Sequence, residues 1–488
     1  MIDRREILDL AATLGLTPHV VEKDYALGWA LAGIYTHPEL ASTWVFKGGT
    51  CLKKCYFETY RFSEDLDFTL QDASHLDEAF LRRVFFEVSE WIYEQSGLEF
   101  PPDFQDFEML TNPRGNPSCQ AKLSYRGPVS PRSPPRIKLD LTADERLVLA
   151  PVQTPIFHPY SDAPDEGFTV QAYAYEEAFG EKVRALAERT RPRDLYDVVN
   201  LFRNTEARPA ATVLLNVLRQ KCEFKGIPVP QLEDLTPHRG QVEGAWGHML
   251  DHQLPSLPPV ATFWDALPEF FRWLLGGEPV PVPAAYRLAE GDTVIRDRTL
   301  RIPVGDRSQS YLEVIRFSAA NRLCVEFDYV DEKGRYSTRV IEPYSLRRTS
   351  EGNIILHAWD VGKDAHRSFR VDRIRGARST GKTFLPRYEV ELTPSGPAPI
   401  SPTGRGGGGG TGFGTSGSFG SSPRSRPARA PRRRAVSGLG SGPTYVYQCG
   451  MCGKKFNRKT MDGRLNNHKA PGGFSCSGRT GFFVDTKH

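Results

Sequence analysis

The stretch RFSEDLDF, residues 61–68, sets two aspartates, Asp65 and Asp67, two positions apart among apolar residues. On a β-strand, side chains two positions apart point to the same face of the sheet. Two carboxylates on one face can hold divalent cations such as Mg²⁺, which prefers oxygen ligands and often shares its shell with substrate phosphates. Paired metal ions stabilise the attacking and the leaving oxygen of an in-line phosphoryl transfer. The stretch therefore predicts a strand that carries a phosphoryl-transfer site.

A glycine-rich turn precedes this strand. Lys47, Gly48, Gly49 and Thr50 follow an apolar strand expected at residues 44–46. Glycine lets the backbone approach a ligand closely, and successive backbone N–H groups can hold a phosphate. We therefore expect these four residues to bind nucleotide. For Lys47 a second interpretation stays open, in which it only flanks the turn.

A third carboxylate, Asp140, lies in the alternating segment IKLDLT, residues 137–142, which we expect to form a neighbouring strand. Taken singly, an Asp-x-Asp pair or a diglycine is more often a surface feature than a catalytic one. In the order strand, diglycine turn, helix, acidic strand and distant acidic strand, they outline a nucleotidyltransferase palm of the polymerase-β type. The sequence thus predicts an α/β (α+β) nucleotidyltransferase core with Asp65, Asp67 and Asp140 as catalytic residues.

Residues 1–205 resemble the AbiEii/AbiGii family of toxin nucleotidyltransferases. Six segments carry the resemblance and match in order: EKDY (22–25), KGGT (47–50), RFSEDLDF (61–68), IKLDLT (137–142), EAFGEKVRAL (177–186) and RPRDLYD (191–197). The resemblance implies Mg²⁺-dependent transfer of a nucleotidyl group from an NTP. It also implies that Asp65 and Asp67 hold the Mg²⁺ and that Ser63 lies beside the triphosphate.

Three residues of the later segments receive roles from the same resemblance. Lys182 would contact phosphates of the incoming nucleotide, and Asp194 would act in catalysis by orienting Lys182 or the nucleotide. Arg193 would pair with phosphate or with Asp197. Composition alone would make Lys182 a solvated lysine and Asp194 an acid that the helix dipole stabilises at an N-terminus.

Residues 293–393 are rich in short β-strands and resemble a WYL domain, an SH3-like β-barrel that senses ligands or nucleic acids. The matching segments are AANR (319–322), VEFDY (325–329), RVIEP (339–343) and HRSFRVDRI (366–374), while Ile354-Ile355-Leu356 replaces the family's Trp-Tyr-Leu. Five basic residues could face a polyanion as a set: Arg339, His357, Arg367, Arg370 and Arg373. Taken singly, each is expected to be a surface or ion-pair residue, and a purely architectural domain is the alternative.

Residues 394–443 consist almost entirely of Gly, Ser, Pro, Thr, Ala and Arg, which predicts a flexible cationic linker because no core can form. Residues 401–488 hold 15 Lys or Arg against two acids, a net charge of +13, whereas the other 400 residues carry −9 within the total of +4. A basic tail on an acidic body favours contact with DNA or RNA, with solubility as the alternative. The residues predicted to bind nucleic acid are Arg432, Arg433, Arg434, Lys454, Lys455, Arg458 and Lys459.

A metal-binding pattern lies near the C-terminus. Cys449 and Cys452 are followed after 15 residues by His468 and after seven more by Cys476. Three thiolates and one imidazole suit tetrahedral Zn²⁺, and a site fully ligated by protein is structural. We therefore predict a CCHC zinc finger. The other five cysteines are scattered, which favours a reducing compartment, the cytoplasm, over a disulfide framework.

These patterns divide the chain into five segments. They are a nucleotidyltransferase core with a helical extension (1–205), a helical or irregular connector (206–292), a WYL-like β domain (293–393), a basic linker (394–443) and a zinc finger (444–488). The sequence contains no run of 18 apolar residues and no apolar signal core at its start, so we expect neither a membrane-spanning helix nor secretion.

The predicted function is that of a Mg²⁺-dependent toxin that transfers a nucleotidyl group from an NTP to RNA, in a toxin–antitoxin or phage-defence setting. The leading acceptor is tRNA, because some members of the family that the chain resembles extend tRNA 3′ ends. An antitoxin partner is expected on the same ground. Two alternatives stay open: transfer to a protein side chain, and a non-catalytic WYL-type regulator that binds nucleic acid.

Overall fold

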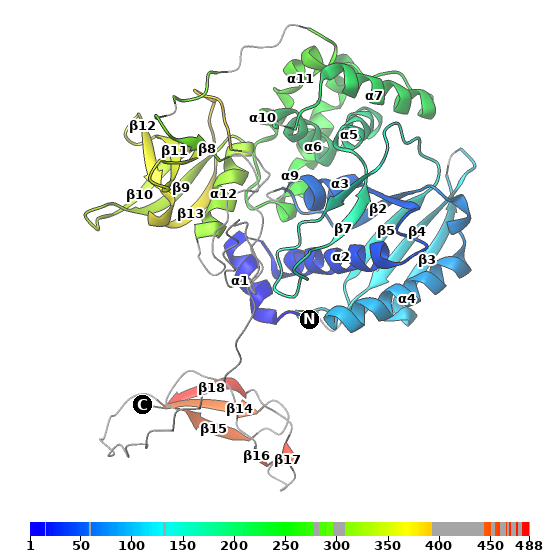
Figure 1. Cartoon of the computed structure of the whole chain (residues 1–488), viewed down its shortest axis with the longest axis horizontal. Coiled ribbons are helices and arrows are strands. Elements are labelled where there is room, and N and C mark those ends of the chain that lie inside the picture. Colours follow the sequence, from blue (N-terminus) through cyan, green and yellow to red (C-terminus); the bar gives the residue numbers. More distant parts are fainter. Residues whose placement is uncertain are drawn as a thin grey trace, which may run out of the picture. The chain divides into compact units, whose positions relative to one another are not determined.

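The computed structural model describes residues 1–392, apart from short gaps, and several strands of the C-terminal region. The gaps lie at residues 15, 58–59, 113, 130–132, 206, 278–282, 288 and 296–307, and the described C-terminal segments are 444–449, 454–458, 465, 468–469, 475–476 and 481–487. The chain divides into two compact units, residues 1–408 and 409–488 (Figure 1). The predicted linker, residues 394–443, lies outside the described residues.

A seven-stranded mixed sheet forms the centre of the first unit, in the order β3-β4-β5-β2-β1-β7-β6. Its strands are β1 (Trp44–Lys47), β2 (Asp65–Leu70), β3 (Gln105–Thr111), β4 (Pro117–Ser124), β5 (Arg136–Thr142), β6 (Val152–Pro155) and β7 (Thr169–Ala172). Strand β2 runs parallel to β5 and antiparallel to β1. The strands predicted at residues 44–46 and 137–142 are confirmed, and the acidic stretch forms β2 as predicted.

One face of this sheet packs on three helices (Figure 1). They are α1 (Arg4–Leu14), α2 (Pro18–Thr36) and α4 (Glu78–Ser96). Leu66 and Phe68 of β2 belong to the buried apolar cluster that includes these helices. Because side chains alternate along a strand, Asp65 and Asp67 point to the opposite face.

Helices on the other side of the sheet share a second apolar cluster with Val45 and Leu52. They are α5 (Tyr175–Arg189), α6 (Pro192–Arg203), α7 (Ala211–Lys225), α8 (Leu232–Leu235), α9 (Arg239–Leu250), α10 (Val260–Trp264) and α11 (Leu267–Leu274). Gly180 lets α5 and α7 approach closely, because a Cβ there would lie 2.7 Å from Cγ1 of Val217. Among the described helices, none is long and apolar enough to cross a membrane.

The region predicted as WYL-like consists of a helix and an antiparallel sheet. The elements are β8 (Thr293–Val294), α12 (Ser308–Ala320), β9 (Leu323–Val330), β10 (Tyr336–Arg348), β11 (Ile354–Asp360), β12 (Ala365–Arg370) and β13 (Ile374–Thr383). The strand order is β12-β11-β10-β9-β13, with β8 paired to β10. Leu312 and Ile315 of α12 share an apolar cluster with Val325 and Phe369 of the sheet. This supports the predicted β domain, whose closure into a barrel stays a prediction.

The second unit contains two small sheets. Strands β14 (Thr444–Cys449), β15 (Lys455–Arg458) and β18 (Gly481–Lys487) form an antiparallel sheet in the order β15-β14-β18. Strands β16 (His468–Lys469) and β17 (Ser475–Cys476) pair with each other. The buried residues Cys449 and Leu465 form a small cluster against the partly buried Phe456.

Candidate active site

Three predicted site residues stand in one row across neighbouring strands. Lys47 of β1 is the register partner of Asp67 of β2, and Asp67 is in turn the partner of Asp140 of β5. Asp65 lies two positions before Asp67 and therefore on the same face. All three aspartates are half-buried. The structure thus brings together the acids that the sequence predicted as catalytic.

Burial and mutual repulsion affect the protonation of these acids. Burial raises the pKa of Asp67 to about 6; the ammonium of Lys47 opposes this shift, and the carboxylate of Asp140 adds to it. Burial also raises the pKa of Asp140, and the negative charge of Asp65 adds to that shift. A cation between the carboxylates would relieve this repulsion.

The chemistry of this donor set fits Mg²⁺, which takes carboxylate oxygens and leaves positions for phosphate. Asp65 and Asp67 are the residues that would hold the ion, with Asp140 on the adjacent strand. Within the described part of the chain, no three His, Cys, Asp or Glu side chains are already arranged as a metal site. The acids therefore supply the right donors, and their side chains would have to converge on the ion.

The diglycine turn lies directly against Asp67. Gly48 begins the short helix α3 (Gly48–Cys51) with φ of +82°, in the left-handed region that favours glycine. A Cβ at Gly48 would lie 1.9 Å from Oδ2 of Asp67. The hydroxyl of Thr50 donates a short hydrogen bond to the backbone carbonyl of Asp65. The turn is thus fixed to the acidic strand at two points.

The second glycine lies against two other residues of the acidic stretch. A Cβ at Gly49 would lie 2.5 Å from Nη2 of Arg61 and 3.1 Å from Oγ of Ser63. Ser63, predicted to lie beside the triphosphate, is therefore next to the predicted phosphate-binding turn. Any side chain at position 49 would displace it or Arg61.

Lys182 reaches the same region from helix α5. Its side chain is buried, and its Nζ lies 2.7 Å from Oδ2 of Asp197 and 3.4 Å from Oδ1 of Asp194. Asp194 also binds Arg189, at 2.7 Å. The ammonium of Lys182 acts against the rise in the pKa of Asp67. The charge of Lys182 is therefore close to Asp65, Asp67 and Asp140, which we call the acidic row. Lys182 and Asp194, both predicted as catalytic, are thus in contact with each other.

Three further residues of this network, Tyr60, Arg61 and Asp197, were not among the predicted site residues. Arg61 binds Asp197 through both ends of the carboxylate, at 2.7 Å each, and Tyr60 donates to the same carboxylate at 2.8 Å. Although burial opposes it, Arg61 and Lys182 hold the pKa of Asp197 well below its usual range. The sequence does offer one signal: Asp197 follows Asp194 by three residues, so the two share one side of a helix.

The described contacts of Arg193 and Lys47 are with residues that the sequence analysis did not name. Arg193 Nε lies 3.4 Å from the backbone carbonyl of Met249, while the carboxylate of Asp197 is taken by Arg61 and Lys182. Lys47 Nζ lies 3.7 Å from Glu145 and flanks the diglycine turn. Contact of either residue with nucleotide stays a prediction.

Two known protein families match parts of the chain. The family model of the nucleotidyl transferase AbiEii toxin of type IV toxin–antitoxin systems matches residues 29–274, half of the chain. The chain belongs to the AbiEii nucleotidyltransferase toxin family. It is a nucleotidyltransferase, and the AbiEii resemblance predicted from the sequence is confirmed. The WYL domain model matches residues 310–379, which confirms the second resemblance.

Two solved structures resemble parts of this AbiEii-family chain. The nucleotidyltransferase toxin MenT4 from Mycobacterium tuberculosis H37Rv is 19% identical, covers 57% of this chain and 91% of its own, and gives a TM-score of 0.41. The proteasome accessory factor B/C of Arthrobacter aurescens is 15% identical, covers 20% of this chain and 16% of its own, and gives a TM-score of 0.16. No curated protein matches the sequence significantly. With TM-scores this low, the assignment rests on the family matches.

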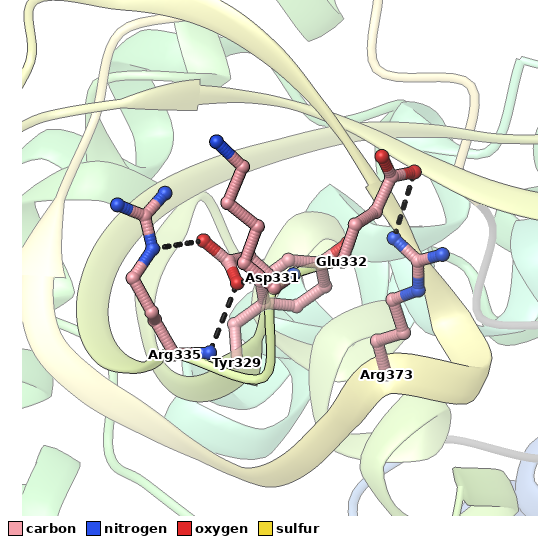
Figure 2. Close-up of a pocket in the computed structure, with 6 residues that line it drawn as sticks. Tyr329, Asp331, Glu332, Arg335 and Arg373 are labelled. Atoms are coloured by element: carbon pink, nitrogen blue, oxygen red, sulfur yellow. Dashed lines mark hydrogen bonds and ion pairs between the residues drawn. The ribbon is translucent and has the colours of Figure 1, made fainter.

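The four arginines predicted to face a polyanion are each paired with an acid of the same domain. The pairs are Arg339–Asp360 (2.6 Å), Arg367–Asp360 (3.7 Å), Arg370–Asp372 (2.8 Å) and Arg373–Glu332 (3.1 Å). Figure 2 shows the last of these, beside a hairpin where Arg335 also binds Asp331. His357 is buried. This arrangement favours the ion-pair interpretation of these residues over a free cationic face.

Most of the predicted residues of the C-terminal region lie outside the described residues. This holds for Cys452, for Arg432, Arg433 and Arg434, for Lys459, and for the side chains of Arg458, His468 and Cys476. Cys449 is buried, and Lys454 and Lys455 are exposed. The zinc site and the nucleic-acid contacts of this region stay predictions.

Proposed function

We propose that this AbiEii-family enzyme uses Mg²⁺ to transfer a nucleotidyl group from an NTP to RNA, with tRNA as the first acceptor to test. The observation that supports it best is the row of Asp67 and Asp140 on adjacent strands, with Asp65 on the same face and the diglycine turn against Asp67. When bound, Mg²⁺ would neutralise charge on the phosphates and on the attacking oxygen. Asp65 and Asp67 would hold it, and Asp140 would complete the acidic set.

The remaining residues would bind and orient the nucleotide. Backbone N–H groups of Gly48 and Gly49 open helix α3 and would approach the phosphates, with Ser63 beside them. Lys182 would contact a phosphate oxygen, since its ammonium lies near the acidic row and is held by buried carboxylates. Asp194 would act by positioning Lys182.

RNA is proposed as acceptor because the chain ends in a basic region. Residues 401–488 carry a net charge of +13, and such charge attracts polyanions. We also propose that Cys449, Cys452, His468 and Cys476 bind structural Zn²⁺ there. Two observations support this: the register partner of His468 is Cys476, and Cys449 is buried at the end of strand β14.

The setting that we propose is a toxin–antitoxin or phage-defence system in the cytoplasm, with a protein antitoxin as partner. The family match supports the toxin role. Transfer to a protein side chain is the competing reaction, and the experiment below separates it from transfer to RNA.

The test is incubation of the purified full chain with total RNA, cellular protein, Mg²⁺ and each labelled NTP in turn. The test variant is Asp65→Asn/Asp67→Asn, and the matched control is Glu108→Gln, an exposed acid on β3 of the same sheet. We expect label in RNA with the wild type and the control, and none with the test variant.

Label in protein alone would replace RNA with a protein acceptor and keep the proposed site. Label in RNA that persists in the double variant would reject the acidic row as the site. Activity that survives complete removal of divalent metal by a chelator would reject the role of Mg²⁺.

A further inference from the structure

The ion-pair network around Lys182, in which Arg189 is exposed and the other members are buried, contains more cations than carboxylates. Three cations, Arg61, Lys182 and Arg189, contact two carboxylates, Asp194 and Asp197. Both carboxylates are fully buried, and water does not share their charge. The contacts therefore leave one more cation than carboxylate in this network.

Asp197 contacts two of the three cations, Arg61 and Lys182. Its Oδ2 contacts both Nη2 of Arg61 and Nζ of Lys182, each at 2.7 Å, so the two cations compete for one oxygen. Arg61 holds both oxygens of Asp197 in a bidentate pair, the strongest arrangement that a guanidinium makes with a carboxylate. Lys182 is thus anchored by Asp197 without being fully neutralised by it.

We propose that Arg61 is a positioning residue, which neutralises Asp197 and so keeps the charge of Lys182 available to the phosphates of the nucleotide. Without Arg61, Asp197 and Asp194 would match Lys182 and Arg189 charge for charge. Lys182 would then form a closed buried ion pair with Asp197, and phosphate would have to break it. The inference rests on the proposed function, in which Lys182 meets the nucleotide.

The position of Arg61 suits this task. Its Nη2 lies where a Cβ of Gly49 would be 2.5 Å away, so the guanidinium is directly behind the predicted phosphate-binding turn. Its remaining Nη1 lies 3.3 Å from Oε1 of Gln253. With these contacts the arginine is fixed between the turn and Asp197.

The test measures the affinity of the full chain for a fluorescent NTP analogue with Mg²⁺ and without acceptor. The variants are Arg61→Gln, Asp197→Asn and the double variant Arg61→Gln/Asp197→Asn. We expect Arg61→Gln to weaken binding about tenfold, the effect of losing one charge-assisted contact to phosphate. Asp197→Asn and the double variant each keep more cations than carboxylates in the network and should bind the analogue more tightly than Arg61→Gln.

The double variant separates charge from packing. If Arg61 only supports the fold, removing Asp197 as well would leave binding as weak as in Arg61→Gln, and the proposal would be wrong. Arg203→Gln is the matched control. Arg203 lies on α6, the helix that carries Asp197, and it donates to the backbone carbonyl of Thr262 at 2.7 Å instead of to a residue of the network. Thermal unfolding of every variant identifies any that fail to fold.

Failure of the inference and failure of the proposed function give different results. A wild type that binds no NTP would reject the nucleotide site itself. A wild type that binds, together with an Arg61→Gln variant that binds equally well, would reject only the role of Arg61. With acceptor present, the expected change in Arg61→Gln is a raised KM for NTP, larger than any change in kcat.

Discussion

At the scale of single residues, Gly48 offers a sharp test of the site because two of its properties can be separated. Its φ of +82° favours glycine, and a Cβ would also collide with Asp67 at 1.9 Å. Gly226, which ends helix α7 with φ of +69°, shares the first property and has open space around its Cβ position. Alanine at either position costs about 1 kcal/mol of left-handed strain.

We therefore expect Gly48→Ala to lose transferase activity about 100-fold, since a displacement of a catalytic group by about 1 Å has effects of that size. Gly226→Ala should keep its activity while losing a similar amount of stability. Initial rates of label incorporation and thermal unfolding of both variants provide the measurement. Equal activity in the two variants would show that the contact of Gly48 with Asp67 does not matter for the reaction.

The same scale shows what the sequence could predict about the site. Asp65, Asp67 and Asp140 could be predicted because side chains alternate along a strand, and this alternation is visible in a few consecutive residues. The contact between Arg61 and Asp197 joins residues that are 136 positions apart. No local pattern predicts such a pair, since it depends on how α6 packs against the stretch before β2.

At the scale of elements, strands β11 and β12 carry a histidine pair that should make stability depend on pH. The rings of His357 and His366 lie 5.3 Å apart, and Tyr286 stacks on His366 with centroids 3.4 Å apart. Burial, together with the charge of Arg347, lowers the pKa of both histidines to about 4. Both are therefore neutral in the folded protein at pH 5, whereas unfolded histidine binds a proton below a pH of about 6.5.

Because the unfolded state binds more protons between these two pKa values, stability falls as pH falls from about 6.5 towards 4. His366→Phe keeps a ring to stack on Tyr286 and removes one of the two titrating groups. We expect the wild type to lose roughly 2–4 °C more in Tm than the variant between pH 7 and pH 5. Calorimetric scans at both pH values provide the measurement, and identical losses would exclude a contribution from His366.

Elements were predictable where they were long or periodic. The helix predicted after the diglycine and the strands around it are present, as are α5 and α6 within the segments that carried the family resemblance. The proline-rich connector, residues 206–292, hides helices as short as α8, with four residues, and α10, with five. Such helices are stabilised by the apolar cluster they share with α5 and α6, and their own sequence has too few turns to show a period.

At the scale of the whole molecule, the order of the parts and the limits between them stay predictions from composition and motifs. The basic Gly/Ser/Pro/Arg linker and the cysteine pattern after it are visible in the sequence. The boundary between the two compact units, at residues 408 and 409, falls within the range predicted as that linker. The family match, by contrast, continues to residue 274, beyond the predicted core limit at 205. Packing of α7–α11 on α5 and α6 explains the difference, because the helices after residue 205 complete the apolar cluster behind Lys182.

The described part of the second unit has few buried apolar residues (Val446, Tyr447, Cys449 and Leu465), which leads to the last prediction. Its described cluster holds only Cys449 and Leu465, with Phe456 partly buried. Domains this small usually need a metal or disulfides, and structural Zn²⁺ commonly supplies the folding free energy. We expect one Zn²⁺ per chain by elemental analysis, lost on chelation together with the pairing of strands β14, β15 and β18.

Chelation should leave the unfolding temperature of residues 1–408 unchanged, because these residues form a compact unit of their own. Cys452→Ser should reproduce the effect of the chelator, whereas Cys324→Ser, at a buried cysteine of the WYL domain, should keep the zinc. Loss of RNA labelling on chelation, with NTP binding intact, would place acceptor recognition in the second unit. A chain that contains no zinc, or keeps it in Cys452→Ser, would reject this ligand set, and the order of the unit would then need another source.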